Sequence, residues 1–524
     1  MSGSSTSDER HPVTGETLWD RYARLAAVRP SDVAVVDDRG RSLSHEQLAD
    51  ASRRVAAALG EAGVRRDDLV LVIMPNTVEW QVVFAATLRL GAVPMTIPIT
   101  TETSTLTYLC DLADVSAVVT VDGSIARSML DMVAEAVAAS ARPATIMAVG
   151  DLATTRVLGP SAAGGRTGRI GELAHVMTTS STTGRPKAVV HSEATLAALN
   201  HGFAERFELR RETPIFMASP LGHSVGAIHG ARLSMYLAAP LVLQERWDPE
   251  RAMDIVHDHH CNFTCAATPF LKDLIDAATP ADRHKLTRLR TFLCGGAAVP
   301  PVLMDRADHE FPETFVSVLW GMTEGGVTTS RFDTTREQRH HTAGCGLPGL
   351  DMRVVDPDLV PLPVGEIGEL VMRGPGVFTG YLRQDDLYRD SLTPDGFFRT
   401  GDLARLDADG YLHLTGRLKD LVIRGGVNIS PVVTEDALAG HPRVSRVAVV
   451  GEPDERLGER LCAVVVTNDG ADLAFDDVIE WVSAQGLPRR QWPESVRRVD
   501  RMPVTAAGKI RKNQLRDELF GGDR

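Results

Sequence analysis

The chain has 524 residues and a mass of 56.6 kDa, with 43% hydrophobic and 24% charged residues. This length and composition exclude a small disulfide-stapled module and predict a folded protein with several sizeable apolar cores. The formal net charge of -13 argues against nucleic acid or an anionic membrane as the main partner.

A cytoplasmic location is also predicted. The six cysteines are too sparse for a secreted disulfide scaffold. Residues 1–15 are rich in Ser and lack an apolar core, so we expect a disordered tail and not a signal peptide. No window reaches the roughly 18 apolar residues that a membrane span requires.

Helical and strand-like segments alternate in the first half of the chain. Residues 43–59 repeat apolar side chains at helical spacing behind the capping candidate Ser44. Residues 68–74 form an apolar run typical of a buried strand, and the helical pattern 78–90 follows. Similar apolar runs recur at 117–121, 144–149 and 241–243. The alternation predicts an α/β architecture of parallel sheets covered by helices.

The pattern changes after about residue 345 to short runs separated by Gly and Pro. Residues 365–372 and 410–415 favour antiparallel hairpins and predict a β-rich subdomain. We place a domain boundary at Lys419, which divides the chain into a tail (1–15), an N-terminal domain (16–418) and a small α+β C-terminal domain (419–524).

The segment 177–192 is the most informative about chemistry. Six consecutive hydroxyl residues, 178–183, precede Gly184 and Lys187. Small donors and a cation on a flexible turn suit a loop that wraps phosphates, although the spacing is not that of a Walker P-loop. A solvated linker is the alternative.

A second signal favours a different enzyme. Gly222-His-Ser224-Val-Gly226 matches the G-x-S-x-G motif between a strand-like and a helix-like segment, the context of a nucleophile elbow. A serine hydrolase with Ser224 as nucleophile is therefore the alternative function, although the upstream oxyanion segment of such enzymes is missing.

Histidines and cysteines also gather in two places. His257, His259, His260, Cys261 and Cys265 resemble a metal-ligand cluster, but we expect a structural role because their side chains would point in several directions. His340 and His341 are expected at the surface.

Five further segments occur in a fixed order along residues 43–515. They are Trp320-Gly-Met-Thr323-Glu324, Arg399-Thr-Gly-Asp402, Gly416-Arg417-Leu-Lys-Asp420, Gly425-Gly426-Val-Asn-Ile-Ser-Pro431 and Pro503-Val-Thr-Ala-Ala-Gly-Lys509. Together with 177–192, they resemble the adenylate-forming ANL superfamily of acyl-CoA ligases, peptide-synthetase adenylation domains and luciferases. The resemblance implies the ANL fold, with a large N-terminal domain of two parallel α/β subdomains and a β-rich subdomain, and a mobile C-terminal domain.

The resemblance also implies a role for each matching residue. ATP phosphates would be bound by Thr179, Ser180, Ser181, Thr182, Thr183, Gly184 and Lys187. Trp320, in place of the commoner Tyr, would lie against adenine, Asp402 would accept from the ribose hydroxyls, and Arg417 would donate to the nucleotide.

The catalytic roles follow in the same way. Thr323 would hold the α-phosphate, Glu324 would hold Mg²⁺, and Lys509 would bridge the carboxylate and the α-phosphate. Lys419 would be the hinge, and Gly425 and Gly426 would line the CoA tunnel. The acyl pocket would be formed by His223, Gly226, Gly295, Gly296 and Gly321.

Two departures from the family pattern concern the phosphate loop. Ser181 and Ala188 stand where the family usually has glycine. If residue 181 takes a positive φ, a side chain costs about 1–2 kcal/mol and crowds the β- and γ-phosphates. The sequence leaves two alternatives open: adenylation is weak and a separate adenylating ligase supplies the acyl-AMP, or the loop tolerates both changes.

The acid is the least constrained part of the reaction. Gly222, Gly226 and Gly230 would share a helix face and leave room beside it, although close helix packing would explain them equally. Since residues 222–231 contain no cationic residue, we expect a bulky apolar acid, with CoA as the acceptor. Luciferase-type oxygen chemistry and a nucleotide-binding protein without turnover are the remaining alternatives.

Overall fold

The computed structural model describes residues 15–122, 126–142, 144–151, 154–158, 173–179, 185–296, 299–504 and 510–521. Several predicted positions lie outside these ranges: the tail residues 1–14, the loop residues Ser180, Ser181, Thr182, Thr183 and Gly184, and Lys509.

The first sheet has eight strands in the order β19-β9-β8-β4-β3-β5-β6-β7. The parallel strands are β3 (Leu69–Val72), β4 (Val93–Thr96), β5 (Ala117–Val121), β6 (Thr145–Val149) and β8 (His175–Thr178). The antiparallel strands at the two ends of this order are β7 (Thr155–Leu158), β9 (Ala188–His191) and β19 (Gly380–Tyr381).

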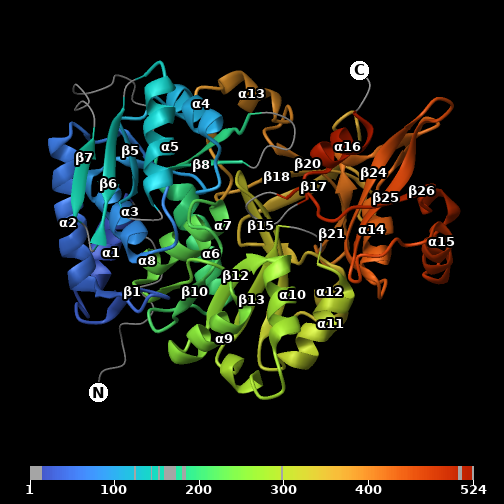
Figure 1. Ribbon diagram of the computed structural model, residues 1–524, viewed down its shortest axis with the longest axis horizontal. Coiled ribbons are helices and arrows are strands. Elements are labelled where there is room, and N and C mark those ends of the chain that lie inside the picture. The colour runs from blue at the N-terminus through green and yellow to red at the C-terminus, as the bar shows by residue number, and fades with distance from the viewer. Residues whose placement is uncertain are drawn as a thin grey trace.

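Alternate residues of these strands face two different cores. Leu69 and Leu71 pack in the cluster formed with α4 (Thr103–Ala113) and α5 (Ala126–Ala139). Val70 and Val72 pack on the opposite face with α2 (His45–Glu61) and α3 (Val78–Leu90), and this cluster extends to the second sheet. The two sheets thus share one buried layer (Figure 1).

The second sheet has nine strands in the order β16-β15-β14-β13-β12-β10-β11-β1-β2. Its strands are β1 (Val33–Asp37), β2 (Ser42–Ser44), β10 (Ile215–Met217), β11 (Leu241–Leu243), β12 (Phe263–Ala267), β13 (Thr291–Gly295), β14 (Phe315–Met322), β15 (Gly325–Thr329) and β16 (Cys345–Gly346). The run from β14 to β1 is parallel. Helices α9 (Pro249–Asp258), α10 (Thr268–Ala277) and α11 (Pro301–Glu310) contribute to the core on its outer face.

The remaining sheets belong to the last third of the chain. The antiparallel sheet β17-β18-β20-β21 consists of β17 (Asp351–Val355), β18 (Gly368–Arg373), β20 (Phe398–Leu406) and β21 (Leu412–Arg417). A five-stranded sheet follows, made of β22 (Val422–Arg424), β23 (Val427–Ile429), β24 (Val444–Asp454), β25 (Gly458–Thr467) and β26 (Ser495–Arg498).

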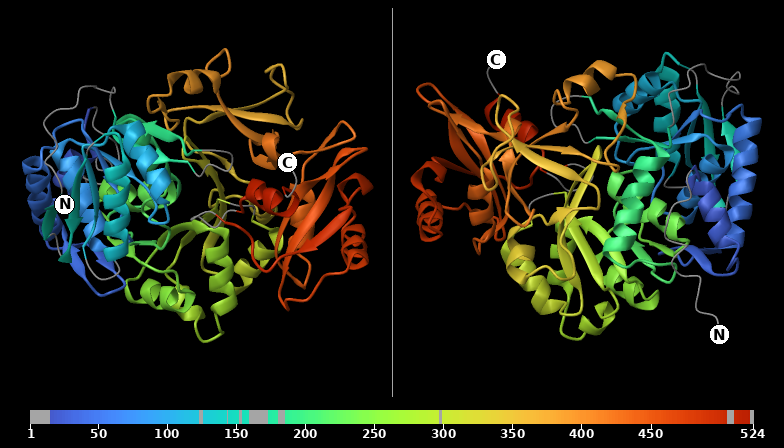
Figure 2. Two further views of the ribbon diagram at one scale, coloured as in Figure 1. Left: turned by 45° about the horizontal axis from the view of Figure 1, so that its top comes forward. Right: turned by 180° about the vertical axis from the view of Figure 1, so that it is seen from behind.

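Three helices, α14 (Val432–Ala439), α15 (Phe475–Ala484) and α16 (Lys512–Phe520), pack on this last sheet and give it two apolar clusters of its own. It lies to one side of the larger body (Figure 2). The predicted α/β architecture is confirmed, including the β-rich unit after residue 345.

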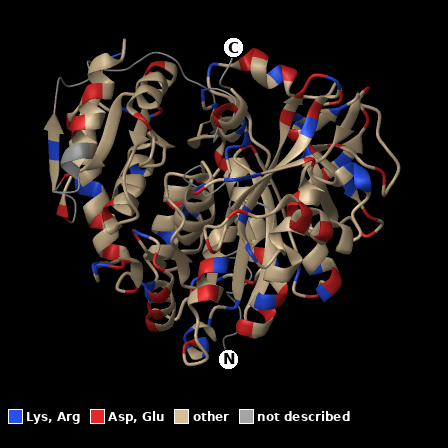
Figure 3. Cartoon of the chain, turned by 45° about the vertical axis from the view of Figure 1, so that its right-hand side comes forward, with Lys and Arg blue, Asp and Glu red and all other residues tan. Residues whose placement is uncertain are grey.

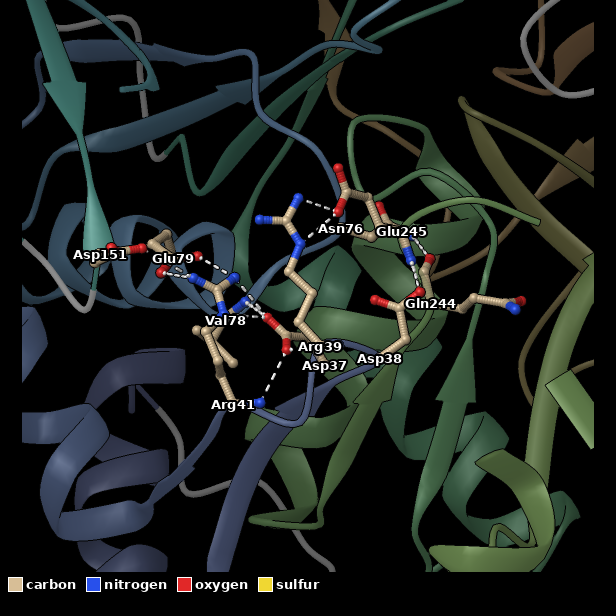
Figure 4. A network of polar contacts seen from close by, with 10 residues as sticks. All are labelled: Asp37, Asp38, Arg39, Arg41, Asn76, Val78, Glu79, Asp151, Gln244 and Glu245. Carbon is tan, nitrogen blue, oxygen red and sulfur yellow. Dashed lines mark hydrogen bonds and ion pairs between the residues drawn. The ribbon is translucent and has the colours of Figure 1, made fainter. Parts of the chain in front are cut away.

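A polar network ties the two large sheets together near the segment that leads to the candidate site (Figure 4). Arg41 binds Asp37 and Glu79, at 2.6 Å in each case. Asn76 donates to the carbonyl of Ser219 at 2.9 Å and accepts from the backbone N–H of Leu221 at 2.8 Å. The loop before α3 thereby fixes residues 219–221.

Acidic and basic residues are interspersed over the helices and loops (Figure 3). The six cysteines are buried and free. Within the ranges given above, no helix is both long and apolar enough to cross a membrane.

One surface prediction was wrong. His340 is 5% exposed, and its ring nitrogens lie 3.0 Å from Asp305 and 2.8 Å from Asp308. The two carboxylates come from α11, so the sequence around His340 could not reveal these contacts. Its neighbour His341 is exposed, as expected.

Candidate active site

Asp402 is the centre of the predicted nucleotide site. Its carboxylate is 3% exposed and lies on β20, directly opposite Arg417 of β21. Oδ1 lies 2.8 Å from Nε of Arg417, and Oδ2 accepts from the indole N–H of Trp320 at 2.8 Å. Both oxygens are therefore oriented by donors that come from two different sheets.

Glu324 follows β14 in the hairpin that ends with β15. Its side chain is 6% exposed, and its Oε1 accepts from the hydroxyl of Tyr381 at 2.9 Å. Burial raises the pKa of Glu324, although the Tyr381 hydrogen bond and the charges of Lys187 and Arg417 oppose this shift. A buried carboxylate beside two cations is suited to bind a cation together with phosphate.

The turn of this hairpin requires glycine. Gly325 has φ of +93°, and a Cβ at this position would overlap the carbonyl oxygen of Gly376. The backbone N–H of Phe378 also donates to the carbonyl of Glu324 at 2.8 Å. The position of Glu324 is thus fixed by its main chain and by its side chain.

Thr323 is held by contacts to its carbonyl and to its hydroxyl group. His191, at the end of β9, donates from Nε2 to the Thr323 carbonyl at 2.8 Å. Burial lowers the pKa of His191 to about 4, so its ring is neutral at pH 7. The Thr323 hydroxyl lies 3.4 Å from Oγ of Ser224, the first residue of α7 (Ser224–Gly226).

Lys187 connects the phosphate-loop segment to Glu324. The backbone N–H of Thr179 donates to the Lys187 carbonyl at 3.1 Å, so these residues close the hairpin of β8 and β9. Nζ of Lys187 lies 4.7 Å from the centre of the Tyr381 ring. The ammonium group is therefore next to the tyrosine that binds Glu324.

Comparisons with known proteins agree with this geometry. The profile of the AMP-binding enzyme family matches residues 22–382, and that of the AMP-binding enzyme C-terminal domain matches residues 434–509. The chain belongs to the AMP-binding enzyme family. The predicted adenylate-forming fold and enzyme class are thereby confirmed at the level of the family.

Individual relatives align over nearly the whole chain. The medium-chain fatty-acid–CoA ligase of Escherichia coli (strain K12) is 30% identical, covering 96% of this chain and 90% of that protein. A salicylyl-CoA synthase / salicylate adenylyltransferase of Streptomyces sp is 31% identical, with coverages of 97% and 94%. The crystal structure of ATP-bound MatB from Rhodopseudomonas palustris superimposes with a TM-score of 0.83 at 28% identity, covering 95% and 98%.

The donor set of this AMP-binding enzyme fits the Mg²⁺ that such a site implies. Mg²⁺ usually binds one or two carboxylates together with substrate phosphates. Glu324 supplies one buried carboxylate, and the described residues contain no group of three or more His, Cys, Asp or Glu side chains that could hold a metal alone. Glu324 would therefore hold the ion only together with phosphate oxygens.

Tyr381 was not among the predicted site residues, and its removal should change the pH dependence of the enzyme. Tyr381→Phe removes the donor that favours the ionised form of Glu324, so the pKa of Glu324 should rise further. If ionised Glu324 is required, the acid limb of the pH–rate profile should move to higher pH. Tyr388→Phe is the matched control. Burial also raises the pKa of Tyr388, but this tyrosine contacts Phe378 and Tyr381 through its ring. An unchanged acid limb in Tyr381→Phe would contradict this coupling.

The hinge and CoA-tunnel candidates lie next in the chain. Burial lowers the pKa of Lys419, and the charge of Arg417 acts in the same direction, so Lys419 lies close to the nucleotide candidates. Gly425 and Gly426, with φ of +57° and +82°, form the two-residue turn between β22 and β23. Both positive φ values explain why glycine is needed at this turn.

The glycines near the predicted acyl pocket differ in the space beside them. A Cβ at Gly222 or Gly226 would overlap the backbone of Ile97 or Pro220, respectively, and a Cβ at Gly295 would overlap the carbonyl of Leu319. The expected open helix face is therefore wrong for Gly222 and Gly226. The helix packing offered as the alternative is also not what is observed, because both glycines are packed against loop backbone. A Cβ at Gly296 would meet nothing within 4 Å, and one at Gly321 would make only ordinary contacts.

The helix after His223 also differs from expectation. Gly222 precedes it, His223 caps α7 through Nδ1, and residues Ala227–Arg232 form a π-helix before α8 (Leu233–Leu237). Gly222, Gly226 and Gly230 consequently do not share one α-helical face. A π-helix often marks a functional site, and this one ends at Arg232.

The geometry does not favour the hydrolase alternative. Burial lowers the pKa of His223 to about 4, and its Nδ1 accepts from the backbone N–H of Val225 at 3.4 Å. Oγ of Ser224 is 3.4 Å from the Thr323 hydroxyl. Neither contact activates a serine nucleophile, and two relatives named above are a CoA ligase and a CoA synthase.

Proposed function

We propose that this enzyme joins a carboxylic acid to CoA through an acyl-adenylate intermediate. The supporting observation is that Asp402 binds Trp320 and Arg417 directly, while the charges of both Arg417 and Lys187 act on Glu324. These residues come from separate motifs, and the family assigns them to one nucleotide. The named relatives that form CoA thioesters support the acceptor.

Each residue would have a distinct task. Trp320 would lie against adenine while its N–H orients Asp402 for the ribose, and Arg417 would donate to the nucleotide. Thr323 would bind the α-phosphate from a main chain anchored by His191, and Lys187 would neutralise phosphate charge. Mg²⁺ bound at Glu324 would further neutralise the phosphates of ATP.

The two half-reactions would use the C-terminal domain in two positions. We place its boundary at Lys419, just after β21 ends at Arg417. In one position Lys509 would bridge the acid and the α-phosphate, and in the other the Gly425–Gly426 turn would admit CoA. The division into residues 16–418 and 419–524 is part of this proposal, as is a cytoplasmic location.

Ala188 fits the structure without evident cost. It is fully buried at the start of β9, opposite Thr178, and its side chain belongs to an apolar cluster. The replacement of glycine at this position therefore gives no reason for weak adenylation. Ser181 remains the residue on which the possibility of a supplied acyl-AMP depends.

Pyrophosphate exchange tests this possibility. If Ser181 impairs adenylation, Ser181→Gly should raise ATP–pyrophosphate exchange by about 5- to 30-fold, since the strain of a positive φ costs about 1–2 kcal/mol. Ala188→Gly is the matched control and should change exchange little. Robust exchange in the unmodified protein, with no gain in Ser181→Gly, would show that the loop tolerates serine and that no separate adenylating ligase is needed.

The thioester assay tests the function itself. CoA thioester formation is measured from a panel of acids with ATP and, in parallel, from their synthetic acyl-AMPs. Product from either source supports the ligase. Tight AMP binding without thioester from any adenylate would instead favour a nucleotide-binding protein without turnover.

A further inference from the structure

Arg232 is a fully buried cation with incomplete hydrogen bonding. Its side chain is 0% exposed, and Nη2 lies 2.5 Å from Oε1 of Glu193. Within the described part of the chain, its Nε and Nη1 groups have no hydrogen-bond partner. Buried donors without an acceptor cost free energy, and a guanidinium group cannot lose its charge to avoid this cost.

Other polar atoms around the same π-helix are also unpaired. Nδ1 of His229, Oδ1 of Asn200 and Oε1 of Gln81 are buried without a partner among the described residues. Both amides are otherwise anchored, because Asn200 donates to the Ile228 carbonyl and Gln81 to the Ala231 carbonyl. Native proteins rarely leave a buried cation with two unpaired donors, so Arg232 indicates a place for a bound polar group.

Arg232 is connected to the reaction centre by one helical segment. This segment begins at Ser224, 3.4 Å from the Thr323 hydroxyl, and reaches Arg232 after eight residues. The charge of Arg232 also acts on His191. Glu193 also follows closely after His191, which binds the Thr323 carbonyl. The Arg232–Glu193 pair is therefore joined to Thr323 both by the π-helix segment and through His191.

We propose that Arg232 binds a second carboxylate at the far end of the acid substrate, so that the enzyme acts on a dicarboxylic acid. This inference rests on the proposed function and replaces the expected apolar acid. That expectation depended on the absence of a cation from residues 222–231, and Arg232 is the next residue. A carboxylate offers acceptors to the free N–H groups of a guanidinium already shared with Glu193, whose side chain is 28% exposed.

The test compares acids that differ only at the far end. Thioester formation is measured with α,ω-diacids of four to ten carbons, with monoacids of equal length, and with the monomethyl esters of the diacids. Each acid is supplied with ATP and, separately, as its synthetic mono-adenylate. At the best chain length, kcat/KM should favour the diacid by about 10- to 100-fold, as a charge-assisted hydrogen bond predicts.

Substitution of Arg232 should remove this preference. In Arg232→Met, the ratio of kcat/KM for diacid and monoacid should fall close to one, and Arg232→Lys should keep part of it. The ratio is measured within one variant, so partial misfolding affects both acids alike. Arg206→Met is the matched control: Arg206 donates to the carbonyls of Cys345 and Gly346, and its loss should leave the ratio unchanged.

The outcomes separate the two proposals. Equal rates for diacid and monoacid in the unmodified protein, equal rates for diacid and monoester, or an unchanged ratio in Arg232→Met would each overturn the second-carboxylate site while the ligase function stands. Failure to form a thioester from any acid or adenylate would overturn the ligase function.

Discussion

Replacing Asp402 by asparagine is expected to raise the KM for ATP by about 10- to 100-fold, because a charged acceptor for the ribose is lost. The free energy of unfolding should also fall by about 1–3 kcal/mol. Arg417 and Trp320 both donate to the carboxylate, and an amide has only one oxygen for them. One of the two donors would then face the amide nitrogen and lose its partner.

Two variants separate the ribose contact from the structural one. Asp407→Asn lies on the same hairpin, where Asp407 binds His413 at 3.0 Å and accepts from the backbone N–H of Tyr411. This variant should lower stability without changing the KM for ATP. Trp320→Phe keeps an aromatic ring but removes the N–H, which frees Oδ2 of Asp402 for the ribose. A KM for ATP that is unchanged in Asp402→Asn would contradict the assigned role.

The sequence predicted elements whose determinants are local. Ser44, the expected capping residue of the first long helix, forms a capping box with Gln47, and the helix at Val78–Leu90 ends at Gly91 in the left-handed region. The apolar run at 68–74 contains a strand whose alternate residues face two cores. In each case, the signal lies within a few residues of the feature that it predicts.

Contacts between distant segments could not be predicted in the same way. The indole N–H of Trp320 on Asp402 and the hydroxyl of Tyr381 on Glu324 join residues 82 and 57 positions apart. Family motifs identified Trp320, Glu324 and Asp402, but no pattern indicated that Tyr381 would join them. His340 was misplaced at the surface for the same reason, because its two carboxylate partners come from another helix.

Arg232 shows how burial leads to a different proposal about specificity. In the sequence it is one arginine among many and follows directly after a glycine-rich stretch. Its burial brings it together with Glu193 of α6 (Glu193–Arg206) and with the buried residues His175 and His191, whose pKa values its charge lowers. Such packing cannot be predicted from the local sequence. The prediction of an apolar acid therefore rested only on the absence of a cation from residues 222–231.

Replacing Glu324 by glutamine should have the largest effect of all on ATP-dependent activity. Because the carboxylate that would hold Mg²⁺ is lost, kcat/KM for adenylation should fall by about 100- to 1,000-fold. Thioester formation from a synthetic acyl-AMP has no β- and γ-phosphates to neutralise and should fall far less. The ratio of these two rates, measured at several Mg²⁺ concentrations, isolates the effect on the metal.

Although Glu324→Gln should lose adenylation activity, its free energy of unfolding should stay equal or rise. Burial raises the pKa of Glu324 in the folded protein, so at neutral pH the ionised side chain favours the unfolded state. Glutamine removes this penalty and still accepts from Tyr381, so urea unfolding should show equal or higher stability at pH 7. The gain should disappear as the pH falls and Glu324 becomes protonated in both the folded and the unfolded state.

Glu452→Gln is the matched control. Glu452 is 5% exposed and binds Arg460 and Arg497, so this variant should lose stability while its ratio of adenylation rate to thioester-forming rate stays unchanged. Adenylation by Glu324→Gln at the rate of the unmodified protein would exclude Glu324 as the residue that holds the metal.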